Sequence, residues 1–170
     1  GAAFLCTLAA GLVLSGPVLP PFADVKAAHR LSDALLTDRH GNVIHEMRVD
    51  PSGRRLEWFA LADISPALCS AVIAAEDRRF RDHGGVDWVA LTASTLRHTL
   101  SGGSRGASTI SMQLASRLDG AATPRGAKRT WREKLRQISA ALALERAWSK
   151  DEILEAYLNL ITFRGELQGI

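Results

Sequence analysis

The stretch AVIAAEDRRFRDHGGVDW, residues 71–88, joins an apolar helical pattern to side chains that can carry out acid–base chemistry. One helical face collects the apolar residues Leu68, Cys69, Val72 and Ile73. At about 100° per residue Glu76 falls within this face, whereas Asp77 turns away. If the helix continues to Phe80, its ring flanks Glu76 and partly desolvates the carboxylate, as suits a general acid or base. If the helix ends at Ala75, Glu76 is a solvated terminal residue.

A second candidate site lies in SGGSRGASTISMQLASRL, residues 101–118, where three glycines within five residues lead into Ser108 and Thr109. Apolar residues then recur at helical spacing: Ile110, Leu114 and Leu118. A loop that ends at a helix N-terminus presents backbone N–H groups and the positive end of the helix dipole, which favour an anion. The alternative is an ordinary capped turn.

Basic residues are concentrated in the middle of the chain. Between Arg97 and Arg136 there are nine Lys or Arg residues against two acidic ones, although the whole chain carries a formal charge of only +3. Such a stripe suits a phosphate-bearing partner or an anionic membrane face, and the alternative is a solvated basic surface. Nucleic acid is disfavoured because the aromatic residues are too few and too scattered to form a stacking platform.

The N-terminal residues 1–23 contain no charged residue, which predicts a membrane anchor truncated at its start or, alternatively, a cleaved secretory signal. Either interpretation places the remainder outside the cytoplasm. Residues 24–62 form a predicted linker with short β elements, since the alternating string at 43–49 lies between two turn signals. The two cysteines indicate no disulfide framework.

Two further helices are predicted near the C-terminus. The first carries an apolar seam made of Trp131, Leu135, Ile138 and Leu142. Ser149 and Glu152 have the spacing of a capping box that opens the second helix. In that helix the residues expected to face inward are Leu154, Tyr157, Leu158 and Ile161. The whole pattern therefore predicts a mainly α fold.

Four strings resemble, in order and spacing, the first four motifs of the peptidoglycan glycosyltransferases, glycosyltransferase family 51. They are AAEDRRFRDHGGVD, GASTISMQL, the KLRQ region and SKDEILEAYLN followed by Phe163. The resemblance covers residues 63–170, and FRGELQGI together with Gln137 is most similar to the penicillin-binding protein 1C subgroup of class A penicillin-binding proteins. It implies a lysozyme-like helical head on an N-terminal transmembrane anchor.

The implied reaction joins the disaccharide-pentapeptide of lipid II to a growing lipid-linked glycan, with inversion and release of undecaprenyl pyrophosphate. The implied partners are lipid II, the nascent glycan strand, the bacterial inner membrane and other cell-wall synthesis proteins. The catalytic domain would lie on the periplasmic side of that membrane. A transpeptidase is expected only in a further C-terminal domain.

The resemblance also assigns roles to residues. Glu76 matches the general base, Asp77 the neighbouring acid, and Phe80 and His83 the residues that shape the cleft. The second and third motifs supply contacts to the donor sugar and pyrophosphate, at Ser108, Gln113, Lys134, Arg136 and Gln137. Tyr157 and Asn159, in the fourth motif, match residues that support the cleft.

Three positions depart from the family pattern. Gln137 replaces a glutamate, Ser116 replaces a basic residue that has Arg117 as a neighbouring substitute, and Arg164 replaces a glycine. An amide cannot carry negative charge, so leaving-group or metal assistance by Mg²⁺ or Mn²⁺ is in doubt and no metal ligand is assigned. We expect activity that depends less on added metal than in glutamate-bearing relatives. Two alternatives are a lytic muramidase and a scaffold that binds lipid II without turnover.

Overall fold

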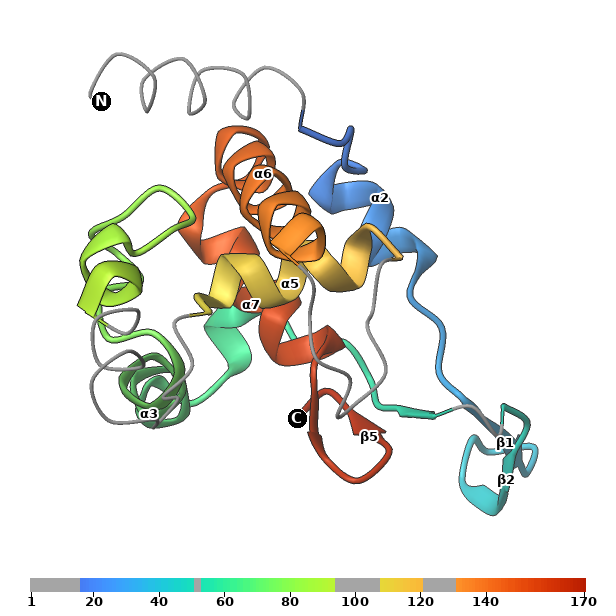
Figure 1. Cartoon of the computed structure of the whole chain (residues 1–170). Coiled ribbons are helices and arrows are strands. Elements are labelled where there is room, and N and C mark those ends of the chain that lie inside the picture. The colour runs from blue at the N-terminus through green and yellow to red at the C-terminus, as the bar shows by residue number, and fades with distance from the viewer. Residues whose placement is uncertain (1–15, 51–52, 94–107, 121–130) are drawn as a thin grey trace.

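A computed structural model describes residues 16–50, 53–93, 108–120 and 131–170 (Figure 1). Within these ranges the chain is mainly helical, with two small sheets, which confirms the prediction of a mainly α fold. Residues 1–15, which hold most of the expected anchor, lie outside the described ranges. In the ranges that are described, every helix is too short or too polar to cross a bilayer.

The helical head is assembled around one short central helix. The helices are α2 (Phe22–Ala28), α3 (Pro66–Glu76), α5 (Ile110–Leu118), α6 (Trp131–Ala147) and α7 (Lys150–Leu160). A 3₁₀ turn, η1 (Leu61–Asp63), precedes α3, and residues 88–93 are also helical. In Figure 1 α5 lies between α6 and α7 and contacts both of them. Most residues of α5 are buried, so it forms the centre of the core.

Capping residues define where the helices begin. Helix α3 starts with Pro66 at its first position, as predicted, although the Ser65 side chain makes no capping hydrogen bond. Thr109 caps α5 by accepting from the Met112 N–H, and Ser149 with Glu152 forms the complete capping box of α7. These three helices begin where the sequence predicted, because a helix cap depends only on residues that are close together in the sequence.

The core contains α5, the inner faces of α6 and α7, and Phe80, which is fully buried. The residues expected to face inward from α7 are buried, or partly buried for Ile161. The predicted seam of α6 is partly wrong, because Leu135 is 40% exposed. The buried face of α6 instead includes the small residues Ala140 and Ala141. The loop at Gly85 approaches the backbone of Ala141 on this face.

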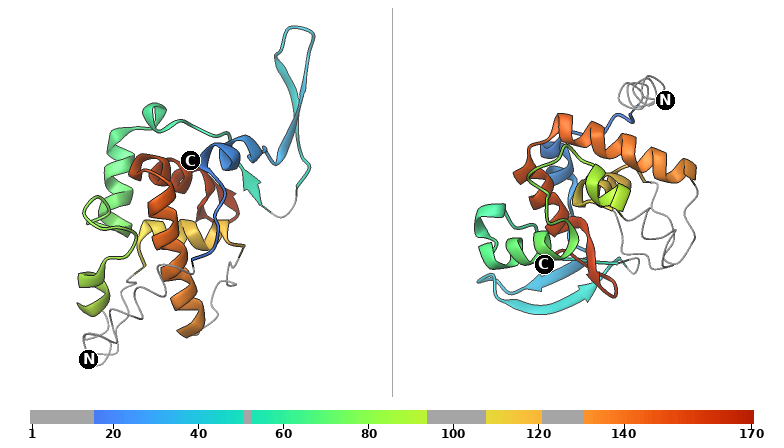
Figure 2. Two further views of the ribbon diagram at one scale, coloured as in Figure 1. Left: turned by 90° about the horizontal axis from the view of Figure 1, so that it is seen from above. Right: turned by 60° about the vertical axis from the view of Figure 1, so that its left-hand side comes forward.

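A β-hairpin projects from the helical head (Figure 2). Strand β1 (Asp33–Thr37) pairs antiparallel with β2 (Val43–Arg48), which confirms the strand predicted at 43–49. The side chains of β2 are exposed along its whole length. Ion pairs fix the base of the hairpin, from Arg48 to Glu166 and from Arg54 to both Asp33 and Glu46.

A second sheet, which the sequence did not indicate, joins the linker to the C-terminal end. Its strands are β3 (Arg54–Arg55), β5 (Leu167–Gln168) and β4 (Thr162–Arg164), in the order β3-β5-β4. Strand β3 runs parallel to β5 and β4 runs antiparallel to it. Strands of two or three residues are too short for a periodic signal, so only tertiary pairing defines them.

Glu155 connects α7 to the linker and to α2. Its carboxylate accepts hydrogen bonds from Lys26 Nζ, Trp58 Nε1 and the Leu61 N–H, each at 2.8 Å. One turn later, the Asn159 amide both donates to and accepts from the Phe59 backbone. Burial alone raises the pKa of Glu155, but its hydrogen bonds outweigh burial and hold this pKa below its ordinary value. The ionised carboxylate therefore holds the linker against the head.

Glu155→Gln should destabilise the protein in a pH-dependent way. Because the folded-state pKa is lowered, the stabilisation by Glu155 is present above its unfolded pKa and lost as pH falls through the folded value. At pH 7 we expect a loss of about 2 kcal/mol, or roughly 6 °C in Tm, that shrinks steadily below about pH 4. Thermal unfolding from pH 3 to 8 measures this, with the exposed Glu57→Gln as control. If the Tm of Glu155→Gln lies below that of the parent by the same amount at every pH in this range, the prediction is wrong.

Candidate active site

The acidic pair lies where α3 ends. Glu76 is the last residue of α3, and Asp77 leaves the helix with φ −156° and ψ 78°. The two neighbouring carboxylates therefore point into different surroundings: Glu76 is exposed, whereas Asp77 is 6% exposed. The prediction that an apolar face desolvates Glu76 while Asp77 turns away is wrong. Helix α3 ends at Glu76, so Phe80 does not continue this face, and no residue of α3 is buried. Glu76 is a solvated terminal residue, which was the alternative that the sequence left open.

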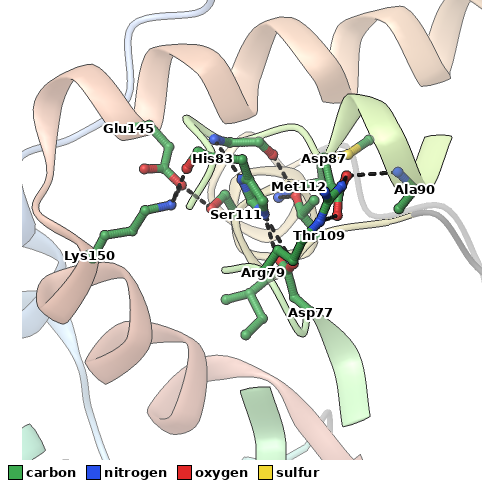
Figure 3. Close-up of polar contacts among 12 residues, drawn as sticks. Asp77, Arg79, His83, Asp87, Ala90, Thr109, Ser111, Met112, Glu145 and Lys150 are labelled. Carbon is green, nitrogen blue, oxygen red and sulfur yellow. Dashed lines mark hydrogen bonds and ion pairs between the residues drawn. The ribbon is translucent and has the colours of Figure 1, made fainter. Parts of the chain in front are cut away.

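The buried Asp77 carboxylate holds two segments together (Figure 3). It accepts from His83 Nε2 at 3.0 Å and from the Ile110 N–H, in the first turn of α5, at 3.1 Å. The Gly85 N–H donates to His83 Nδ1 at 3.2 Å, so the proton of this imidazole is assigned to Nε2. His83 therefore holds the first motif, as the resemblance implied.

The N-terminus of α5 already holds an anion from the protein itself. The Asp77 carboxylate accepts a hydrogen bond from the Ile110 N–H, and the Thr109 hydroxyl accepts one from the Met112 N–H. The sequence suggested that an external anion binds at this helix N-terminus, and the Asp77 carboxylate already occupies part of that position. The glycine-rich loop at 101–107, which belonged to that suggestion, lies outside the described residues.

Lys150 supports the loop that carries His83 (Figure 3). Its Nζ donates to the His83 carbonyl and to Glu145, each at 2.6 Å, and lies 4.5 Å from the centre of the Phe80 ring. Glu145 also accepts from the Ser111 hydroxyl of α5. Phe80, which was expected to shape the cleft, is instead a core residue beneath the loop.

Gly85 allows this loop to pack closely against α6. Its φ is +97°, and a Cβ there would lie 2.8 Å from the Ala141 carbonyl oxygen. Any other L residue would therefore meet both an unfavourable backbone conformation and a backbone clash. Just beyond, an ion pair joins Arg79 to Asp87, and this hydrogen-bonded guanidinium holds the pKa of Asp87 below its ordinary value.

Glu76 is held by a glutamine. Gln113 Nε2 donates to Glu76 Oε2 at 2.9 Å, and Gln113 Oε1 accepts from the Tyr157 hydroxyl at 3.2 Å. Burial, with a smaller contribution from the charges of Glu76 and Asp77, raises the pKa of Tyr157 above its ordinary value. Tyr157 therefore stays protonated and can donate at any pH near neutrality. The motif resemblance gave it only a supporting role.

The cation expected to bind phosphate lies near the start of α5. Lys134 Nζ donates to Ser108 Oγ at 3.1 Å and to Gln137 Oε1 at 3.2 Å. The other end of the Gln137 amide donates to the Met112 carbonyl at 3.2 Å. Ser108, Lys134 and Gln137 thus form one cluster, and Met112 is the residue next to Gln113.

The departure at Gln137 has a structural explanation. Gln137 is buried, and both ends of its amide bond to other protein groups. A neutral oxygen that already accepts from an ammonium group does not fit a divalent cation. Among the described residues no cluster of three carboxylate, histidine or cysteine side chains could hold a metal ion.

Arg136 is not part of the Lys134 cluster. Its guanidinium forms an ion pair with Asp119, just after α5, with Nε 2.7 Å from Oδ2. Its expected role beside Lys134 at the pyrophosphate is therefore not supported by its position. Several other residues of the basic stripe lie outside the described ranges: Arg97, Arg105, Arg125, Lys128 and Arg129.

The site thus consists of three groups of side chains that meet around the first turns of α5. The first pairs Glu76 with Gln113, the second pairs Asp77 with His83, and the third joins Lys134 to Ser108 and Gln137. Of the predicted site residues, Phe80 and Arg136 lie apart from these groups. The sequence did not reveal that Tyr157 contacts Gln113, because a tyrosine on an inward helical face is usually a core residue.

Comparison with known proteins identifies the family. Residues 40–170 match the family described as "Transglycosylase". This match spans most of the chain and includes all three groups of site residues. The chain therefore belongs to the transglycosylase family, which confirms the family resemblance drawn from its motifs.

Individual relatives agree with this assignment. The "Biosynthetic peptidoglycan transglycosylase" of Mannheimia succiniciproducens is 40% identical over 117 residues, which are 67% of this chain and 45% of the relative. The protein of the same name from Salmonella paratyphi B is 36% identical over 165 residues, which are 94% of this chain and 60% of the relative. The chain thus spans 45% and 60% of the length of these two relatives.

Proposed function

We propose that the protein containing this chain is a peptidoglycan glycosyltransferase that polymerises lipid II into glycan strands. The observation that carries the proposal is the geometry of Glu76. Its carboxylate is exposed at the end of α3 and held by Gln113, and the Lys134 cluster contacts the same helix, α5, at the neighbouring Met112. An accessible base and a nearby cation are the two groups that glycosyl transfer to a hydroxyl, with a pyrophosphate leaving group, requires.

Glu76 is the general base in this proposal. The 4-hydroxyl oxygen of the acceptor sugar attacks the anomeric carbon of the donor from the side opposite the pyrophosphate. The bond from that carbon to the pyrophosphate oxygen breaks, and its electron pair leaves with undecaprenyl pyrophosphate. The hydroxyl proton passes to the Glu76 carboxylate. One inversion at the anomeric carbon follows from this single displacement.

Lys134 is the group that stabilises the leaving pyrophosphate. Its Nζ donates to neutral oxygens of Ser108 and Gln137, which hold this ammonium group beside the start of α5. A fixed cation of this kind favours the charge that develops on a departing phosphate oxygen. Asp77 and His83 act on structure here, by holding the loop and the start of α5.

We also propose a subgroup of the family and a cellular location for the protein. The ending FRGELQGI together with Gln137 supports membership of the penicillin-binding protein 1C subgroup, in which a separate C-terminal domain would carry transpeptidase activity. The uncharged residues 1–23 support a single inner-membrane anchor, with the head on the periplasmic side and other cell-wall synthesis proteins as neighbours.

Glu76→Gln should abolish polymerisation. The substitution keeps an acceptor for Gln113 but removes the base, so the rate should fall at least ~10²–10⁴-fold while lipid II binding and Tm stay near those of the parent. The measurement is glycan formation from labelled lipid II by the full-length protein. Asp82→Asn, which changes an exposed carboxylate of the following loop, is the matched control and should retain activity.

Three outcomes of this assay contradict the proposal in different ways. Residual activity above about a hundredth of the parental rate removes Glu76 from the role of base. Shortening of added glycan without polymer formation indicates a lytic muramidase. Binding of lipid II by the parent without turnover indicates a scaffold.

Lys134→Ala should weaken both the binding of lipid II and its turnover. A charge-assisted contact is worth roughly 1.5–3 kcal/mol, which corresponds to about 10- to 150-fold, whereas a lone exposed charge is worth far less. Arg146→Ala, at the exposed far end of the same helix α6, is the control. Titration with lipid II and with a phosphoglycolipid inhibitor measures the difference. If both variants lose the same small fraction of lipid II affinity, Lys134 is an ordinary solvated cation and does not bind pyrophosphate.

Full-length protein expressed in a Gram-negative host should fractionate with the inner membrane and resist extraction by salt or carbonate. The reason is that the uncharged residues 1–23 would anchor it by hydrophobic insertion. Fractionation followed by mass determination of the mature chain measures this. Recovery of a shortened protein from the periplasm shows that the segment is a cleaved signal.

A further inference from the structure

A chain of two hydrogen bonds connects the buried core to Glu76. The Tyr157 hydroxyl, from α7, donates to Gln113 Oε1, and Gln113 Nε2, from α5, donates to the carboxylate at the end of α3. Tyr157 is 1% exposed, whereas Glu76 is exposed. The amide of Gln113 is therefore the link between a rigid core side chain and the accessible carboxylate.

The orientation of this amide decides whether it helps or hinders the carboxylate. The oxygen and nitrogen of a glutamine side chain have nearly the same shape, so packing alone does not distinguish the two orientations. With Nε2 toward Glu76 the amide donates to a carboxylate, but with Oε1 toward Glu76 two acceptors face each other. A donor on the far side of the amide is needed to favour the first orientation.

Tyr157 supplies that donor. Its hydroxyl hydrogen bonds to Gln113 Oε1, which places Nε2 on the side of Glu76. Burial keeps the pKa of Tyr157 above its ordinary value, so the donor is not lost to ionisation near neutral pH. The tyrosine ring itself belongs to the core, and a phenylalanine can fill the same space without the donor.

We propose that Tyr157 is a positioning residue of the transfer reaction, which acts through the Gln113 amide to hold the Glu76 carboxylate in its reactive orientation. This inference rests on the proposed function, in which Glu76 is the base. It goes beyond the support role that the fourth motif implies, because it assigns the effect to one hydroxyl group. Tyr157 does not contact the reacting atoms.

A double-mutant cycle with full-length protein tests the route of this effect. Tyr157→Phe should lower kcat for lipid II polymerisation about tenfold, with KM changed less than about twofold, as expected for loss of one buried hydrogen bond. Gln113→Ala should lower kcat further. Adding Tyr157→Phe to Gln113→Ala should then have no more than about a twofold effect, because the hydroxyl has no amide left to orient.

Two variants and one spectroscopic measurement separate the explanations. Ser139→Ala, which removes another buried hydroxyl with a backbone acceptor, should leave kcat unchanged. The Gln113 side-chain amide can be assigned in a ¹⁵N-glutamine spectrum by its loss in Gln113→Ala. In the parent its two N–H signals should be well separated, and in Tyr157→Phe they should move toward those of a free glutamine.

The results have distinct meanings. Equal fold losses from Tyr157→Phe in both backgrounds, or an unchanged Gln113 amide spectrum, overturn the inference. An unchanged kcat in Tyr157→Phe also overturns it. If the parent and Glu76→Gln are equally inactive, the proposed function fails, and the amide spectrum alone decides whether Tyr157 orients Gln113.

Discussion

The burial of Asp77 is the constraint on which the rest of the site depends. An unpaired ionised carboxylate in a protein interior costs many kcal/mol, so Asp77 has to be surrounded by donors. His83 and the first turn of α5 supply them, and each charge-assisted contact contributes roughly 1.5–3 kcal/mol. The same contacts bring the end of α3 to the start of α5. Glu76 reaches Gln113 only because its neighbour is fixed in this way.

This arrangement gives two adjacent carboxylates opposite roles. The chain leaves the helical conformation at Asp77, so the pair does not share one helical face. The Asp77 carboxylate accepts hydrogen bonds that hold His83 and the start of α5 in place. The Glu76 carboxylate is exposed, so a sugar hydroxyl can reach it. Asp77 therefore stabilises the fold, whereas Glu76, one residue earlier, is the accessible carboxylate that we propose as the base. Substitution of either residue should affect different properties of the protein, stability for Asp77 and chemistry for Glu76.

Local signals in the sequence predicted α3, α5, α6, α7 and strand β2, but not helix α2 or the contacts that make the site. The cap at Thr109 and the capping box at Ser149 depend on neighbouring residues, and they predicted α5 and α7 well. The burial of Glu76 was predicted wrongly, because periodicity reports neither that α3 stops before Phe80 nor that no residue of α3 is buried. The link from Tyr157 to Gln113 spans 44 residues, and the short strands β3 and β5 pair across more than 100, so only folding reveals them.

The exposure of Glu76 also bears on how it can act as a base. The sequence suggested that apolar neighbours prepare this carboxylate, but the structure surrounds it with solvent and one amide donor. A general base has to reach the proton that it accepts, and the hydrogen bond from Gln113 holds the carboxylate in one direction. In the proposed reaction, the bound substrate would contribute to excluding water from this carboxylate, which strengthens proton transfer. Gln113 thus fixes the direction of the carboxylate, and in the proposed reaction the acceptor sugar would complete its environment on binding.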